Sequence, residues 1–315
     1  MKINPRVLQI DAHFGDGYVA LYLIRGKKIA IIDTGVPDTP LNYIEPALRP
    51  QKLGLDDIDY ILNTHSHPDH TGGNIALQIA SQANIFIHKE EVSFVKNHEK
   101  SFREQLEPAI KAIMGESCLQ EEKNRFMAIA GPDQVNVRPL KDNDIIDLEG
   151  GCSLRVIHLP GHSEGSVGFY WEKEGILFSG DSLPGLQHRD GGLPIIHNLS
   201  AFQRSLERTN QLSPALILHS HEFRGIKLPG STVKRKEEIK QFIGDSHEIT
   251  ERLIEAIGKI ARNSSGLSFS EIYNQVVALL PVEFGFKSIG EKPFYLVSQI
   301  TVFNQLRKLN VFPGN

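Results

Sequence analysis

Six consecutive residues carry the side chains best suited to chemistry, and they are His65, Ser66, His67, Pro68, Asp69 and His70. Imidazole nitrogens and carboxylate oxygens are the ligands that proteins offer to zinc and similar transition metals. Residues two apart on an extended segment point the same way, so His65 and His67 can bind one ion. If the chain then turns, Asp69 and His70 can face a second ion. From the frequencies of His and Asp in this chain, such a run arises by chance on the order of once in a thousand sequences.

Three later apolar runs predict buried strands, and each is followed by a histidine or an aspartate. These runs cover residues 154–159, 175–179 and 215–218. The first leads to His162 through a Pro-Gly break, the second to Asp181 through one glycine, and the third to the sequence His219-Ser220-His221. Ligand side chains on loops at strand ends are typical of a metal site that a rigid scaffold holds.

These segments together resemble the metallo-β-lactamase fold superfamily of metal-dependent hydrolases, over roughly residues 5–240. The resemblance rests on separate matches at Ile32-Asp33-Thr34-Gly35, His65 to His70, Pro160-Gly161-His162-Ser163, Gly180-Asp181-Ser182 and His221. Thr64 to His70 also shows the pattern Thr-His-x-His-x-Asp-His of the glyoxalase II-like thioesterase subgroup. A true β-lactamase is disfavoured, because that class lacks the histidine at position 70 and usually has a cysteine in place of Asp181.

The resemblance implies a centre with two divalent metal ions, zinc first, with manganese or iron as other options. The first ion would be held by His65, His67 and His162, and the second by Asp69, His70 and His221. Asp181 would bridge both ions, Asp33 would lie behind a ligand and orient it, and Asp69 or Asp181 would help to move a proton. His221 is preferred to His219 because the late histidine of the family sits between two small residues, which Ser220 matches at one side.

The loop at 183–198 follows Asp181 directly and contains few regular signals. Three of its side chains are therefore candidates for the substrate pocket, and they are His188, Arg189 and His197.

Repeated strand-helix-strand units predict an α/β fold, and the resemblance specifies an αββα sandwich. Strands are expected at 7–10, 18–24, 29–33, 57–63, 85–88 and 135–139, with helical connections near 40–53, 71–82, 199–212 and 233–243. Residues 89–130 break the rhythm and predict a helical insertion, which is either a plain crossover or a cap over the metal site. We expect a catalytic domain at 1–243 and a second domain at 244–315.

The C-terminal segment predicts three helices, at about 248–262, from a capping box at Ser268-Phe269-Ser270-Glu271 to 280, and around 296–306. They resemble the small winged-helix-like domain that follows the hydrolase domain in one branch of the superfamily. From Gly244 onward seven basic residues face seven acidic ones. A nucleic-acid reader normally carries a basic surplus, so packing against the catalytic domain is favoured.

Composition narrows the class of protein further. The chain has 315 residues with 40% hydrophobic residues and a net charge of −4, which fits a globular protein without a polyanion-binding surface. Two cysteines argue against a disulfide scaffold and favour a cytoplasmic location. The N-terminus shows neither signal peptide nor membrane span. The oligomeric state is open, with a homodimer as one option.

The leading hypothesis is a binuclear hydrolase in which a metal-bridging hydroxide attacks a thioester, ester or lactone of a small molecule. A metal-dependent phosphodiesterase or ribonuclease is the first alternative. An iron-bound redox protein or a non-catalytic metal-binding protein is the second.

Overall fold

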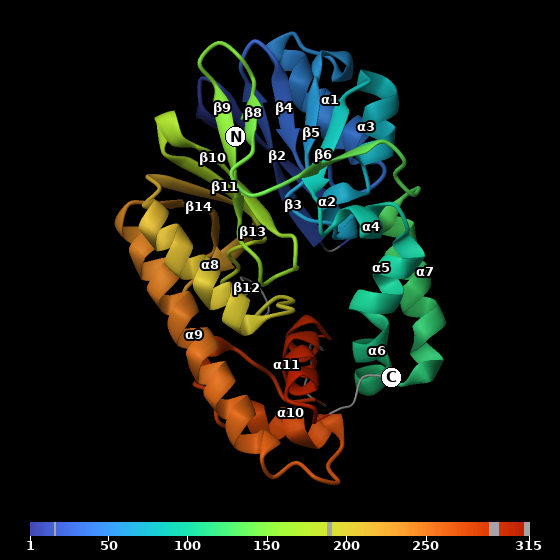
Figure 1. The fold of residues 1–315 in the computed structure, drawn as a ribbon, viewed down its shortest axis with the longest axis vertical. Helices are drawn as coiled ribbons and strands as arrows, with labels where there is room; N and C mark the ends of the chain where they lie inside the picture. The colour runs from blue at the N-terminus through green and yellow to red at the C-terminus, as the bar shows by residue number, and fades with distance from the viewer. Residues whose placement is uncertain (16, 188–190, 290–295, 312–315) are drawn as a thin grey trace.

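The computed structural model describes residues 1–15, 17–187, 191–289 and 296–311. Two sheets pack face to face, with helices on their outer sides (Figure 1). The first sheet has the order β1 (Lys2–Asn4), β2 (Val7–Phe14), β3 (Gly17–Arg25), β4 (Ile29–Ile32), β5 (Tyr60–Leu62), β6 (Asn84–His88) and β7 (Val137–Leu140). The second has the order β12 (Leu186–Gln187), β13 (Leu216–Arg224), β11 (Ile176–Gly180), β10 (Val167–Trp171), β9 (Ser153–His158) and β8 (Ile145–Asp147), and β14 (Ser231–Arg235) also pairs with β13.

The alternation of side chains along buried strands creates the layers. On β3, Tyr22 points between the two sheets, where its ring lies 5.6 Å from that of Phe178 on β11. Its neighbours Leu21 and Leu23 belong to the apolar cluster on the outer face of the first sheet. Because successive strand residues face opposite sides, a strand that is apolar throughout must be covered on both faces. The α/β sandwich expected from the sequence is confirmed.

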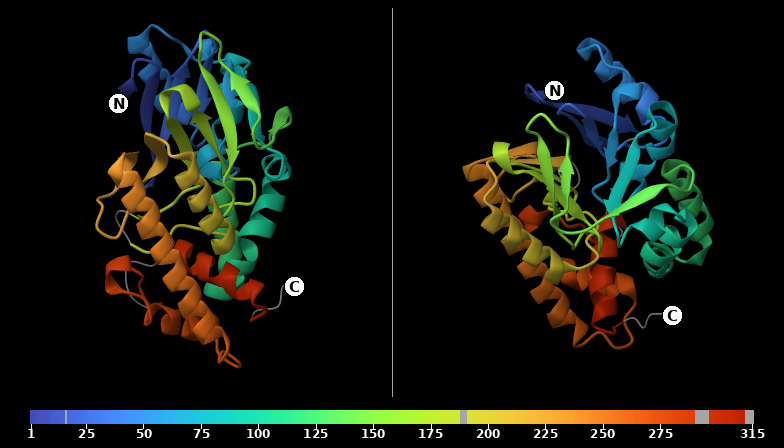
Figure 2. Two further views of the ribbon diagram at one scale, coloured as in Figure 1. Left: turned by 60° about the vertical axis from the view of Figure 1, so that its left-hand side comes forward. Right: turned by 45° about the horizontal axis from the view of Figure 1, so that its top comes forward.

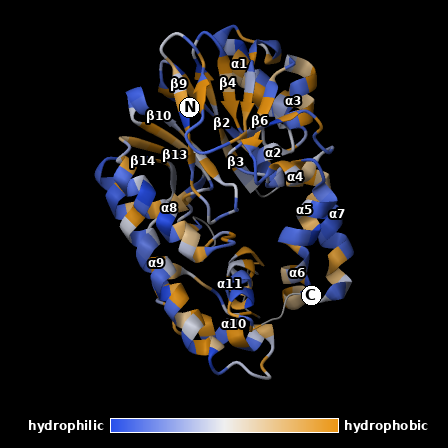
Figure 3. Ribbon diagram, viewed as in Figure 1, coloured by the Kyte–Doolittle hydropathy of each residue, from blue (hydrophilic) through white to orange (hydrophobic). Residues whose placement is uncertain are grey.

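The helices occupy the two outer layers and the lower part of the molecule in Figure 1. The first sheet is covered by α1 (Glu45–Leu48) and α3 (Asn74–Ser81). Helix α2 (Pro68–Thr71) follows the carboxyl end of β5. The second sheet is covered by α8 (Leu199–Leu212) and α9 (Glu237–Ala261). Figure 3 shows the apolar strands between these layers and a largely hydrophilic outer side on α9.

The helical insertion is present between β6 and β7. It comprises α4 (Val92–Val95), α5 (His98–Gln105), α6 (Glu107–Met114) and α7 (Leu119–Ala130). Phe102, Ile110 and Phe126 form a small apolar core of its own. In Figure 2 its helices lie beside the C-terminal helices, and α6 packs against both α10 (Phe269–Val277) and α11 (Leu296–Lys308).

The C-terminal region is helical, and α10 begins with the expected capping box of Ser268 and Glu271. The domain boundary expected after residue 243 falls inside α9, which continues across it as one helix. Ile272 of α10 and Leu306 of α11 share one apolar cluster with Leu177 of β11, so this region packs directly on the second sheet. Within 244–289 and 296–311 the structure has no strand, so the winged-helix resemblance stays a prediction.

Two local expectations were wrong. The helix expected at 233–243 begins only at Glu237, because residues 231–235 form β14 and Lys234 is buried. The Lys234 ammonium donates to the carbonyls of Phe223, Pro229 and Ser231, which compensates its burial. The strand expected at 215–218 is present in β13, but it continues to Arg224, so His219 and His221 lie on the strand and not on the loop that was expected after it. None of the helices in the described ranges combines the length and apolar character that crossing a bilayer requires.

Candidate metal centre

The candidate ligands come from the carboxyl ends of neighbouring strands. Strands β4 and β5 are parallel, so Asp33 after β4 and the His65 to His70 run after β5 emerge at the same edge of the first sheet. At the facing edge of the second sheet, β11 ends in Gly180, whose φ is +53°. A Cβ on Gly180 would lie 2.5 Å from Cβ of Thr64, so only glycine lets the Asp181 loop approach the first sheet.

The turn within the six-residue run has a local cause. His67 is extended, with φ −62° and ψ 145°, and Pro68 then occupies the first position of α2. Proline is favoured there because its φ is already helical and its missing N–H would have no partner. His65 and His67 therefore precede the turn, whereas Asp69 and His70 lie within it. This is the arrangement that allows the two pairs to face different ions.

The structure brings the first three candidate ligands together. The Nε2 atom of His162 lies 3.1 Å from Nε2 of His65 and 2.9 Å from Nδ1 of His67. These three residues form a group whose ligand atoms all lie within 4.8 Å of one another. His65 and His162 are buried, and His67 is half-buried. The first expected site is therefore assembled geometrically.

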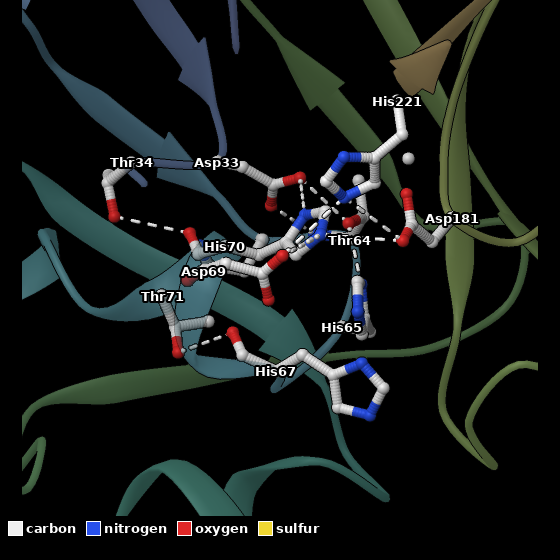
Figure 4. A network of polar contacts seen from close by, with 12 residues as sticks. Asp33, Thr34, Thr64, His65, His67, Asp69, His70, Thr71, Asp181 and His221 are labelled. Carbon is white, nitrogen blue, oxygen red and sulfur yellow. Dashed lines mark hydrogen bonds and ion pairs between the residues drawn. The ribbon is translucent and has the colours of Figure 1, made fainter. Parts of the chain in front are cut away.

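The second group lies beside the first, and Figure 4 shows its three members with Asp181, His65 and His67. The Oδ2 atom of Asp69 lies 3.5 Å from Nε2 of His221 and 3.7 Å from Nε2 of His70. The Oδ2 atom of Asp181 lies 3.4 Å from His221 Nε2, 3.7 Å from His70 Nε2 and 3.9 Å from His162 Nε2. One carboxylate thus touches members of both groups, as a bridging ligand would.

Partners behind the ligands set the orientation of the rings. His70 Nδ1 donates to Oδ2 of Asp33 at 2.9 Å, so His70 directs Nε2 at the cluster. Asp33 also accepts from the Thr64 hydroxyl at 2.8 Å and from the Thr64 backbone N–H at 2.9 Å. Asp33 is fully buried and has a φ of +58°, a conformation that costs free energy in a residue other than glycine. Its predicted place behind a ligand matches this geometry.

The other two ring orientations follow from hydrogen bonds of the same kind. Because the Thr64 hydroxyl donates to Asp33, its oxygen accepts from Nδ1 of His65, which lies 3.0 Å away. His162 Nδ1 donates to the backbone carbonyl of Ile195 at 2.6 Å. Both Nε2 atoms are therefore unprotonated and direct their lone pairs toward each other across 3.1 Å. Two lone pairs in that position repel unless a cation lies between them.

Burial and neighbouring charges shift the pKa values of the clustered histidines in opposite directions. Burial, followed by the adjacent imidazoles, holds the pKa of His65 well below its usual value, and burial likewise lowers the pKa of His162. For His70, burial opposes the charged form, but Asp69, Asp181 and Asp33 outweigh it and hold its pKa well above the usual value. Against the effect of burial, the adjacent histidines keep the pKa values of Asp69 and Asp181 low, so both carboxylates are ionised.

The residues present fit a divalent metal centre. His70 Nε2 and Asp181 Oδ1 are buried and have no hydrogen-bond partner among the described residues, and an uncompensated buried polar atom is costly. Ionised carboxylates and neutral imidazoles bind zinc, manganese or iron, so an ion would take the place of the proton that the neighbouring carboxylates favour on His70. A bound ion would satisfy these atoms and remove the repulsion between the facing lone pairs.

His219 does not lie in the cluster. Its ring is fully buried against Phe242, with ring centroids 5.0 Å apart, and Nδ1 lies 2.9 Å from the Ser179 hydroxyl. The pairing of β13 is irregular after Leu218, and such a bulge re-aims side chains, so His219 and His221 do not share a direction. Residues two apart on a regular strand would point the same way, so the irregular pairing is what lets His221, and not His219, join the cluster.

Of the three pocket candidates in the 183–198 loop, the structure describes only His197. His188 and Arg189 lie outside the described residues. His197 is not among the cavity-lining residues, and its ring centroid lies 6.2 Å from that of His67. Asn304 of α11 lies 3.3 Å from His197 Nδ1, so the C-terminal helix reaches the ring next to a candidate ligand. His197 is better described as a residue beside the centre.

Glu91 was missed by the sequence reasoning. It is fully buried at the start of the insertion and accepts from the Ser66 hydroxyl, from the Ser163 hydroxyl at 2.7 Å and from the Gly165 N–H at 2.7 Å. It therefore joins the loop of His65 and His67 to the loop of His162. In sequence it is one acid within a charged stretch, and no local signal distinguishes it from its exposed neighbour Glu90.

A cavity of about 760 Å³ opens over the cluster. His67, Asp69, His162, Asp181 and His221 are among the residues that line it. Small-molecule sites have volumes of roughly 300–1,000 Å³, so the centre is accessible to a substrate of that size.

Comparison with known proteins agrees with this geometry. The model of the family described as Metallo-beta-lactamase superfamily matches residues 14–221. The probable metallo-hydrolase YqjP of Bacillus subtilis is 24% identical over 229 residues, which are 68% of this chain and 70% of that protein. A hydroxyacylglutathione hydrolase of Pelagibacter ubique is 27% identical over 177 residues, 56% of this chain and 55% of that protein. The crystal structure of a metallo-beta-lactamase family protein from Thermus thermophilus matches with a TM-score of 0.67 at 21% identity, covering 98% of this chain and 95% of the other.

Proposed function

Because the chain belongs to the metallo-beta-lactamase superfamily of metal-dependent hydrolases, we propose that it cleaves an ester-type bond of a small molecule. The bond would be that of a thioester, an ester or a lactone. The observation that carries this proposal is the pair of three-residue ligand groups that share Asp181 and open on one cavity. The similarity to a hydroxyacylglutathione hydrolase supports the ester-type bond.

The proposed ligands of a first divalent ion are His65, His67 and His162, and those of a second are Asp69, His70 and His221. Asp181 would contact both ions, which we propose to be zinc. Two such ions supply an activated water and an electrophile for the carbonyl oxygen of the substrate.

The protein groups would position the reaction and move its proton. Asp33 holds the His70 ring through Nδ1, so that Nε2 stays directed at the cluster. Asp69 is ionised, its side chain is 23% exposed and it lines the cavity, whereas Asp181 is 7% exposed. Asp69 is therefore the better placed carboxylate for passing a proton to the leaving group.

A phosphodiester substrate finds less support in the described residues. The cavity lining there includes no lysine or arginine that would pair with a phosphate. The C-terminal region, for which a nucleic-acid role was the alternative, packs into the core of the second sheet and contributes Val297 to the cavity. We propose that this region completes the substrate pocket.

The test combines metal analysis with a substrate panel. Protein purified with zinc and without chelator should contain about two ions per chain and should hydrolyse members of a thioester, ester and lactone panel. Chelation should abolish turnover, and added zinc should restore it. Asp142→Asn, an acid outside the cavity, is the control that should retain metal and turnover. Cleavage restricted to phosphodiesters, or one ion per chain after supplementation, would contradict the proposal.

A further inference from the structure

We infer that the cavity selects an uncharged apolar chain on the substrate and disfavours an anionic one. This inference rests on the proposed function and specifies its substrate class. It would make acyl-chain length and charge, more than the leaving group, the features that the protein recognises.

Phe14, Ile195 and Phe223 give the cavity apolar lining from the core, and a further apolar wall comes from two segments outside it. Leu106, at the junction of α5 and α6, and Phe126 and Ile129 of α7 line the cavity from the insertion, while Val297 of α11 lines it from the C-terminal region. Phe126 is 7% exposed, so its ring is anchored in the small core of the insertion while one face borders the cavity. Apolar surface of this kind gains free energy only by covering apolar surface of a ligand.

The two segments support each other, so the wall is a fixed part of the fold. Helix α6 packs against α10 and α11 (Figure 2). Ala109 of α6 belongs to the same apolar cluster as Ile300 and Phe303 of α11. The wall therefore has a defined position relative to the candidate metal ligands that line the same cavity. An acyl group whose carbonyl lies at the ligands would direct its chain toward this wall.

Charge along the cavity argues against an anionic chain. Asp11 and Glu222 line it in addition to the candidate ligands, and its described lining has no lysine or arginine. Asp11 Oδ1 accepts from the Tyr18 hydroxyl at 2.9 Å and from Nε2 of Gln9 at 2.7 Å, which fixes the carboxylate at the rim. A substrate carboxylate against the apolar wall would lose hydration, and the described lining offers no basic side chain to replace it.

A matched series of thioesters tests the inference with metal-loaded protein. N-acetylcysteamine thioesters of acetate, butanoate, hexanoate and octanoate differ only in chain length. Burial of each added methylene is worth about 0.8 kcal/mol, so kcat/KM should rise about fourfold per methylene until the wall is filled. Suberoyl thioester has the length of octanoyl thioester and one terminal carboxylate, and it should be at least about tenfold poorer. A flat chain-length profile, or equal rates for octanoyl and suberoyl thioesters, would overturn the inference.

Substitutions locate the selectivity on the wall. Phe126→Ala should lower kcat/KM for the octanoyl thioester by about tenfold or more and leave the acetyl thioester within about twofold. Phe126 also packs inside the insertion, so its loss could disturb folding. Val297→Ser on α11, at a half-buried position, is therefore the second variant, and it should lower kcat/KM for the octanoyl thioester by a smaller factor. Val282→Ser changes a valine that is 93% exposed and outside the cavity, and should alter neither thioester. Equal losses for both thioesters in both wall variants would refute the role of the wall.

Binding of neutral amides separates this inference from the proposed function. Octanamide should bind the metal-loaded protein at least about tenfold more tightly than acetamide by calorimetry, and Val297→Ser should weaken octanamide alone. If no ester-type substrate is cleaved but octanamide binds as expected, the proposed function fails and the apolar pocket stands. If octanamide binds no better than acetamide while thioesters are cleaved, the inference fails and the hydrolase stands.

Discussion

The two histidines of β13 provide a paired test of the candidate centre. His221→Ala removes a group that lies 3.5 Å from Asp69 and 3.4 Å from Asp181. His219→Ala removes a ring packed on Phe242 and the contact to the Ser179 hydroxyl. The substitutions are chemically identical and two residues apart, so any difference between them reports the geometry. We expect opposite effects on metal content and on folding stability.

The magnitudes follow from burial. His219 is 0% exposed, and removal of a large buried side chain costs about 2–4 kcal/mol when its cavity does not collapse. The corresponding fall in Tm is roughly 4–10 °C for a protein of this size. The His221 side chain is 23% exposed, so its removal from metal-free protein should cost about 1 kcal/mol or less. Loss of a ligand should weaken the second ion by more than the roughly 10–100-fold that loss of an outer partner costs.

The assay measures metal by elemental analysis after dialysis and unfolding by denaturant titration of metal-free protein. His219→Ala should keep both ions and lose stability, and His221→Ala should keep its metal-free stability and lose one ion. His219→Leu fills most of the same space and guards against a misfolded alanine variant. If His219→Leu loses an ion and His221→Ala retains both, the assignment of the last ligand is reversed.

Four further outcomes are expected. Asp181→Ala should abolish turnover and lower metal content while far-UV circular dichroism stays unchanged, since Asp181 touches both ligand groups from a loop; near-normal turnover would exclude a bridging role. Asp33→Asn should lower metal affinity by about 10–100-fold, measured by competition with a chelator, because it weakens the contact that orients His70. Burial, followed by the stacked His158, lowers the pKa of His88 from 6.5 to about 4, so the unfolded chain binds a proton that the folded chain does not. Stability of metal-free protein should therefore fall as the pH drops from about 6.5 to 4, and less steeply in His88→Phe; identical slopes in urea titrations would contradict this. Leu306→Ala in α11 should cost about 2–5 kcal/mol, and a cost below about 1 kcal/mol would show that the C-terminal region unfolds separately.

The sequence predicted the parts of the centre that depend on local geometry. An extended His-x-His followed by proline must place two ligands before a turn and two within it, and α2 begins at Pro68 as that reasoning requires. Apolar runs predicted the strands, and β5 and β11 end where the ligand loops begin. These features need only the strand period, the φ of proline and the freedom of glycine.

What the sequence could not predict depends on contacts between distant segments. Lys234 lies in a basic triplet that suggests a solvated helix, yet pairing of β14 with β13 buries it beneath carbonyls that no local pattern identifies. His219 faces the outer helices like Ile217, as alternation predicts, whereas the direction of His221 depends on the irregular pairing of β13 after Leu218. Glu91 gains its role only when the loops of Ser66 and Ser163 meet.

Because α11 lines the cavity, the C-terminal helices could give this chain a substrate preference different from that of proteins with the same metal ligands. The candidate ligands lie on β13 or shortly after other strands, where the two sheets hold them in place, whereas the apolar wall comes from the insertion and from α11. Asn304 of α11 also contacts His197, the ring beside His67. Since the wall can change without moving a strand, substrate choice and ligand geometry are separable in this fold. Substitutions on α7 and α11 should accordingly alter which chain is accepted before they alter metal content.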